Sequence, residues 1–100
     1  MNQLYKGGTV YIMSSTCKRS LYTGVTSDII KRVWQHKNGY YSGSYTSKYN
    51  CCLLVYYRHF DSITDAIAEE KRIKGGNRIN KERLVESMNY EWCDLSNDFY

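Results

Sequence analysis

Two short stretches near the N-terminus alternate between apolar and polar positions. In residues 9–13 the aliphatic side chains fall on one face and Tyr11 falls on the other, which is the period-two pattern of a strand. Residues 21–25 repeat the pattern, with Tyr22 and Gly24 together on one face. The polar segment between the two stretches is typical of a hairpin connection. The pattern therefore predicts an antiparallel hairpin that exposes both tyrosines on the face opposite its aliphatic residues.

A helix is predicted next, from about Asp28 to Asn38. The sequence Thr-Ser-Asp is a typical helix start, and the glycine after Asn38 is a typical stop. Arg32 and His36 lie four residues apart and therefore project from one face of this helix. Helical spacing places four of its residues toward the core: Ile30, Val33, Trp34 and Lys37.

The second half of the chain predicts one more strand and two more helices. Residues 52–59 form a nearly continuous apolar run, which is typical of a central or most buried strand. Ser62 caps a helix that runs to Lys74 and ends at a Gly-Gly pair, and a third helix covers about residues 80–88. The order β-β-α-β-α-α predicts an α/β (α+β) domain with a small three-stranded, largely antiparallel sheet flanked by helices.

Glu70 interrupts the apolar stripe of the second predicted helix. A carboxylate on a core-facing stripe costs free energy unless a buried arginine, a group of hydroxyls or a metal ion pairs with it. The alternative is that Glu70 lies at the edge of the stripe and reaches water. The apolar residues of the stripe are Ile63, Ala66, Ile67 and Ile73.

Length and composition narrow the class of protein. One hundred residues predict a single domain over 1–100 with a core from about 8 to 95. With no membrane-length apolar run and no apolar leader, we expect a cytoplasmic location. Four cysteines without a CxxC spacing are expected to be reduced thiols rather than zinc ligands. A net charge of +4 and eleven tyrosines favour an anionic partner such as nucleic acid, although tyrosines also fill ordinary strands.

Five segments in the same order resemble the GIY-YIG nucleases, in particular their small stand-alone bacterial members with a single URI-type domain. The first segment reads Thr-Val-Tyr and then Tyr-Thr-Gly where the family has Gly-Ile-Tyr and Tyr-Ile-Gly, so the tyrosines and the second glycine are kept. The resemblance covers residues 8–95. Its five segments are 9–11 with 22–24, then 25–37, 46–49, 66–75 and 86–95.

The resemblance implies an endonuclease that hydrolyses phosphodiester bonds in DNA with strand or structure selectivity. It implies that Glu70 holds one Mg²⁺ or Mn²⁺ ion and that Tyr11 is the general base or positions the water. Tyr11 would then need a lowered pKa, supplied by the cation and by Arg32 or His36. Tyr22 would orient the water or phosphate, Arg32 would neutralise charge, and His36 would relay a proton.

The resemblance also implies residues that bind the substrate. Gly24 keeps the floor of the site open, and Lys48 and Arg78 contact the DNA backbone. Further backbone contacts, or simply a solvated helix face, are expected from Lys71, Arg72, Lys74 and Lys81. Two other functions stay open: a module on this scaffold that binds nucleic acid without cutting it, and a protein-interaction domain. No membrane partner is expected.

Overall fold

A three-stranded antiparallel sheet organises the chain, in the strand order β2-β1-β3. The structure is a computed structural model and describes residues 7–38 and 49–99. Its element order and fold class confirm the prediction, with a short 3-10 helix, η2, added near the C-terminus. The elements are β1 (Gly8–Ser15), β2 (Leu21–Thr26), α1 (Ile29–Lys37), β3 (Cys51–Phe60), α3 (Ile63–Lys74), α4 (Arg78–Met88) and η2 (Leu95–Asp98).

The central strand is β1, and every residue of it is buried. The prediction that the apolar run in β3 marks the central strand is therefore wrong. Helices cover both faces of β3, so this strand is apolar although it has only one strand neighbour among the described residues. An apolar run shows that both faces of a strand are buried. An edge strand that is covered by helices on both faces meets this condition as well as a central strand does.

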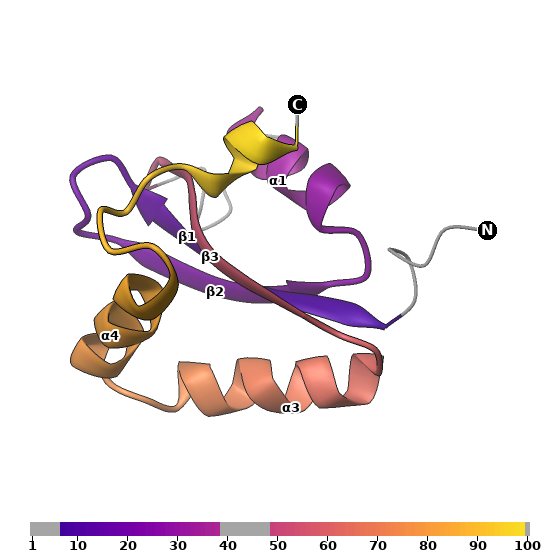
Figure 1. Ribbon diagram of the computed structural model, residues 1–100. Coiled ribbons are helices and arrows are strands. Elements are labelled where there is room, and N and C mark those ends of the chain that lie inside the picture. Colours follow the sequence, from indigo (N-terminus) through magenta and orange to yellow (C-terminus); the bar gives the residue numbers. More distant parts are fainter. Residues whose placement is uncertain (1–6, 39–48, 100) are drawn as a thin grey trace.

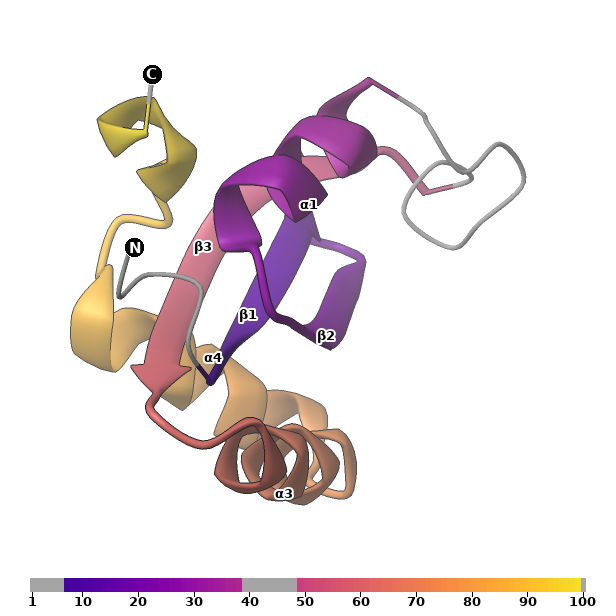
Figure 2. The ribbon, with the colours of Figure 1, turned by 90° about the vertical axis from the view of Figure 1, so that its right-hand side faces the viewer.

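The two faces of the sheet carry separate cores. Val10 and Ile12 of β1 pack with residues of α3 and α4, whereas Tyr11 and Met13 pack with Val33 of α1. Figure 1 shows α1 and η2 on one side of the sheet and α3 and α4 on the other, and Figure 2 shows the same layers end-on. No helix in the described part of the chain has the length and apolarity needed to cross a membrane.

Helix α1 begins as predicted but turns a different face to the sheet. The Asp28 side chain accepts a hydrogen bond from the backbone N–H of Lys31 and caps the helix, within the predicted Thr-Ser-Asp start. Trp34 was expected in the core, yet 51% of it is exposed, and the helix buries His36 instead. A buried histidine is tolerated because it has a hydrogen-bond partner in the sheet below. The spacing of apolar residues along α1 contains no information about that partner.

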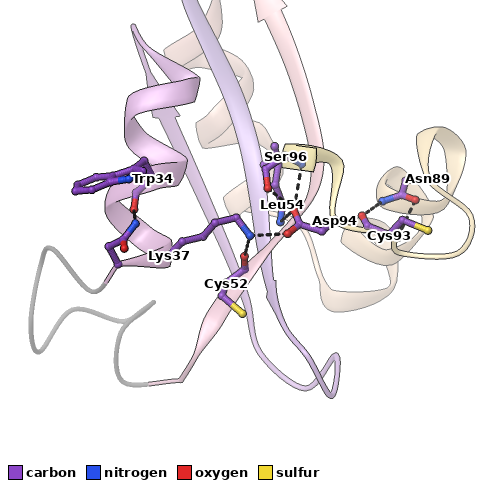
Figure 3. A network of polar contacts seen from close by, with 9 residues as sticks. Trp34, Lys37, Cys52, Leu54, Asn89, Cys93, Asp94 and Ser96 are labelled. Atoms are coloured by element: carbon purple, nitrogen blue, oxygen red, sulfur yellow. Dashed lines mark hydrogen bonds and ion pairs between the residues drawn. The ribbon is translucent and has the colours of Figure 1, made fainter. Parts of the chain in front are cut away.

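Asp94 ties the C-terminal segment to α1 and β3 (Figure 3). Its carboxylate accepts hydrogen bonds from the backbone N–H groups of Leu54 and Ser96 and pairs with the Lys37 ammonium. Lys37 also donates to the carbonyl of Cys52 at 2.7 Å. Burial opposes ionisation of Asp94, but these hydrogen bonds outweigh it and hold the pKa of the carboxyl below its ordinary value.

Asp94→Asn should therefore lower the free energy of unfolding by about 2 kcal/mol, because charge-assisted hydrogen bonds are the strong ones in proteins. Urea denaturation at neutral pH measures the change. Asp98→Asn, an exposed position in the same 3-10 helix, is the matched control and should change stability by less than about 0.5 kcal/mol. Equal midpoints for the two variants would contradict a role for Asp94 in holding these elements together.

Candidate active site

Tyr11 lies at the centre of β1, underneath α1. Its hydroxyl is 2.9 Å from Nε2 of His36, and both side chains are buried. The predicted exposure of Tyr11 is thus wrong, because α1 covers the face that was expected to be open. The hydrogen bond couples the phenol and the imidazole.

Tyr22 and Gly24 of β2 lie beside this pair. The ring centre of Tyr22 is 6.2 Å from that of Tyr11 and 5.5 Å from that of His36, so the three rings form a triangle. Gly24 is the register partner of Tyr11. A Cβ atom built on Gly24 would lie 2.6 Å from the Tyr11 hydroxyl oxygen, well inside van der Waals contact. Gly24 therefore leaves the space that the phenol occupies.

We expect Gly24→Ala to lower the free energy of unfolding by about 1–3 kcal/mol, since the added methyl group overpacks a buried ring. Chemical denaturation measures this change. Gly75→Ala is the matched control, because its Cβ would come no closer than 3.4 Å to the Lys71 carbonyl. A Gly24→Ala protein as stable as the control variant would show that the Tyr11 ring has room to move.

Arg32 supplies a positive charge close to both partners of the hydrogen bond. Burial raises the pKa of the Tyr11 phenol above its ordinary value, the neighbouring Tyr22 adds to the rise, and Arg32 offsets part of it. Burial, and then the Arg32 charge, lower the pKa of His36 to about 4. The pKa of Tyr11 is therefore raised here, not lowered as the sequence had suggested. At neutral pH His36 is uncharged, so one of its ring nitrogens is unprotonated and can accept a hydrogen bond.

Glu70 approaches the same place from the other side of the sheet. Although α3 packs on the face opposite α1, it contacts the edge strand β2. The Glu70 carboxylate pairs with Lys74 at 2.7 Å, and the Lys74 ammonium lies 6.0 Å from the ring centre of Tyr22. The negative charge of Glu70 also contributes to the raised pKa of Tyr11. Glu70 therefore reaches the tyrosines at the β2 edge.

The buried row of α3 explains this placement of Glu70. Ala66 and Ile73 are buried, but Ile63 and Ile67, expected in the same stripe, are 41% and 38% exposed. Glu70 consequently flanks the buried row instead of lying within it, and 13% of its side chain remains accessible. It is close to the core yet open to a ligand.

All five predicted catalytic residues thus lie around Tyr11. One further residue beside them, Lys74, was missed in the sequence. The sequence assigned Lys74 only to the group of backbone contacts, whereas the structure pairs it with Glu70. The spacing of four residues on one helix was the signal that would have found it.

The predicted substrate-binding residues have different outcomes. Arg78 starts α4 and donates to the backbone carbonyls of Lys18 and Arg19 in the β1–β2 turn. It also pairs with Glu82 at 2.8 Å. With these partners Arg78 ties α4 to the hairpin, and a phosphate contact would have to replace one of them. Lys48 lies outside the described residues.

The donor set at Glu70 fits a hard divalent cation. Mg²⁺ binds through one or two carboxylates together with substrate phosphates and keeps several of its waters. Glu70 is a single, partly accessible carboxylate, which suits that mode of binding, and a cation would replace its Lys74 partner. Among the described residues, no three His, Cys, Asp or Glu side chains are arranged to hold a metal ion by themselves.

Comparisons with known proteins agree with this geometry. A family model described as the GIY-YIG catalytic domain matches residues 7–83. A UPF0213 protein from Staphylococcus saprophyticus is 40% identical over 76 residues, covering 75% of this chain and 92% of that protein. Another from Syntrophus aciditrophicus is 35% identical over 77 residues, covering 77% and 87%.

A solved structure is similar as well. The solution NMR structure of a UPF0213 protein from Bacillus halodurans is 30% identical and superposes with a TM-score of 0.55, covering 85% of this chain and 88% of that one. The family match spans more than half of the chain and contains every side chain of the cluster around Tyr11. The chain therefore belongs to the GIY-YIG family of nuclease domains, and it is similar to the small UPF0213 proteins.

Proposed function

We propose that this domain is an endonuclease that hydrolyses phosphodiester bonds in DNA with the help of Mg²⁺ or Mn²⁺. The observation that carries the proposal is the hydrogen bond between the Tyr11 hydroxyl and an uncharged His36, placed beside Arg32 and Glu70. Phosphodiester hydrolysis needs a group that takes a proton from water and positive charge on the phosphoryl oxygens. This cluster offers both.

Tyr11 and His36 act together as the base. A phenol with a raised pKa is protonated at neutral pH, so no ready phenolate exists to deprotonate water. The Tyr11 oxygen instead accepts a proton from the attacking water as its own proton passes to Nε2 of His36. The water oxygen forms the new bond to phosphorus, and the bond from phosphorus to the leaving oxygen of the sugar breaks.

Arg32 links substrate binding to this proton transfer. Its charge is one of the causes that hold the pKa of His36 low. A phosphate bound at the guanidinium would offset that charge and make His36 a better proton acceptor. The proton relay therefore improves when substrate is in place, and the same guanidinium neutralises charge that develops on the phosphate.

Two further groups complete the site. Tyr22 orients the water or the phosphate through its hydroxyl. A divalent cation held by Glu70 would supply additional charge stabilisation on the phosphoryl oxygens.

Cleavage of labelled single-stranded, duplex and branched DNA tests the proposal. Products should appear with Mg²⁺ or Mn²⁺ and should be absent with excess chelator, and comparison of the three substrates measures the selectivity for strand or structure. Undiminished cleavage in the chelator would refute the dependence on metal. A protein that binds all three DNAs and cuts none with either metal would instead be the binding module considered from the sequence.

A further inference from the structure

Helix α3 carries two ion pairs on opposite flanks of its buried row. One pair joins Glu70 to Lys74 at the β2 edge, and the other joins Glu69 to Arg72 at 2.5 Å. At about 100° per residue, Arg72 lies roughly 200° around the helix from Glu70. The Glu69–Arg72 pair faces β3, because both of its charges act on the pKa of Tyr56 in that strand. One flank of α3 therefore lies toward β2 and the other toward β3.

A groove of about 410 Å³ opens between the end of α3 and α4, on the flank away from Glu70. Its cationic lining residues are Arg72, Lys81 and Arg83, and its apolar floor is formed by Ile73 and Leu84. Amide and hydroxyl groups complete the lining, and it contains no carboxylate. The groove thus presents hydrogen-bond donors and positive charge above an apolar base.

The nearby carboxylates on both helices are engaged with other groups. Glu69 offsets Arg72, whereas Glu82 pairs with Arg78 and Glu86 accepts a hydrogen bond from the Trp92 ring. Lys81 donates to the carbonyl of Gly76, which satisfies one proton without neutralising its charge.

Lys81 and Arg83 have no carboxylate partner within the described parts of the chain. The groove therefore holds two positive charges that an anion can neutralise. Arg58 of β3 lies outside the groove lining but adds positive charge near Glu69, because its charge helps to lower the pKa of that carboxyl.

We propose that the α3–α4 groove binds the sugar–phosphate backbone of a nucleic acid, at a second contact point separate from the Tyr11 site. Lysine, arginine, asparagine and serine side chains make most protein contacts to phosphate and sugar, and this lining contains all four. Helix α3 lies between the groove and Glu70, and the path half-way round a helix of 10–12 Å diameter is about 16–19 Å. A strand rising 3.4 Å per nucleotide covers that path in about five nucleotides.

The choice of nucleic acid as the ligand rests on the proposed function. An acidic protein segment is the other partner that this charge pattern could attract, and the experiment separates the two. The basic residues of the C-terminal half then have different roles. Lys74 serves Glu70, Arg78 holds the hairpin, and Arg72, Lys81 and Arg83 form the groove.

Binding measured in chelator tests the groove independently of cleavage. Fluorescence anisotropy with a labelled DNA duplex, over a series of salt concentrations, gives the affinity and its salt dependence. Arg83→Gln should weaken binding several-fold and reduce the slope of log K against log salt by about 0.9, which is the loss of one phosphate contact. Lys81→Gln should do the same, and urea denaturation of each variant verifies its fold.

Arg19→Gln is the matched control, since it removes an equally exposed charge from the β1–β2 turn and should leave binding unchanged. Wild-type affinity and slope for both groove variants would overturn the proposal. The proposal would also be overturned if both groove variants lost binding to labelled polyglutamate while they kept wild-type DNA binding, because the groove would then fit an acidic protein segment. Weaker DNA binding by a protein that cuts no DNA would support the groove and refute the nuclease.

Discussion

Glu70→Gln should reduce metal-dependent cleavage of DNA by about a thousandfold or more. The substitution keeps the size of the side chain and removes the charge that would hold the cation. Loss of several kcal/mol of charge stabilisation on the phosphoryl oxygens corresponds to that factor. Initial rates at saturating DNA and Mg²⁺ measure the effect. DNA binding in chelator should be largely retained, because Glu70 donates no hydrogen bond to a phosphate.

The neighbouring glutamate is an unusually close control. Glu69 lies on the same helix, pairs with a basic residue, and has the same 13% side-chain exposure, but it occupies the other flank. Glu69→Gln should cut DNA at nearly the wild-type rate. Equal losses in the two variants would mean that α3 tolerates neither change for structural reasons, and Glu70 would lose its assignment as the metal ligand.

Tyr11→Phe should slow cleavage by roughly a hundredfold or more, in the range that general acid–base catalysis contributes. Phenylalanine keeps the ring that packs under α1 and removes only the hydroxyl that bonds to His36. The proton relay is then broken at its first member. Single-turnover rates with excess enzyme separate this chemical effect from any change in DNA binding.

Tyr56→Phe provides the comparison for Tyr11→Phe. Tyr56 is also buried and its pKa is also raised by burial, but it belongs to the core on the opposite face of the sheet. This variant should cleave normally. If Tyr11→Phe also cleaved at the wild-type rate, the base would have to be sought in Tyr22 or His36.

The sequence predicted those features that depend on local chemistry. The cap at Ser62 and the helix start at Thr-Ser-Asp were found because serine and aspartate side chains accept hydrogen bonds from the third residue of a helix, as Ser62 and Asp28 do in the structure. The end of α3 at Lys74 followed from the Gly-Gly pair. The order of motifs led to the five residues that meet around Tyr11, because side-chain spacing within each element is fixed.

Features that depend on contacts between elements could not be predicted in this way. The face of α1 that turns inward carries His36, whose hydrogen-bond partner is the Tyr11 hydroxyl, and no pattern within α1 contains Tyr11. Similarly, Arg78 looked like one of several free cations on a helix. Its partners are carbonyl oxygens of the β1–β2 turn, 59 and 60 residues earlier in the chain.

The family match and the contacts that hold α1 in place cover different lengths of this chain. The family match ends at residue 83, yet α1 is anchored by Asp94, which also holds the backbone of β3. His36 directly precedes Lys37, the residue that Asp94 grips. A domain boundary drawn by similarity would therefore cut away the support of His36, a residue of the proposed proton relay. Any excised or transplanted version of this nuclease domain should extend through η2.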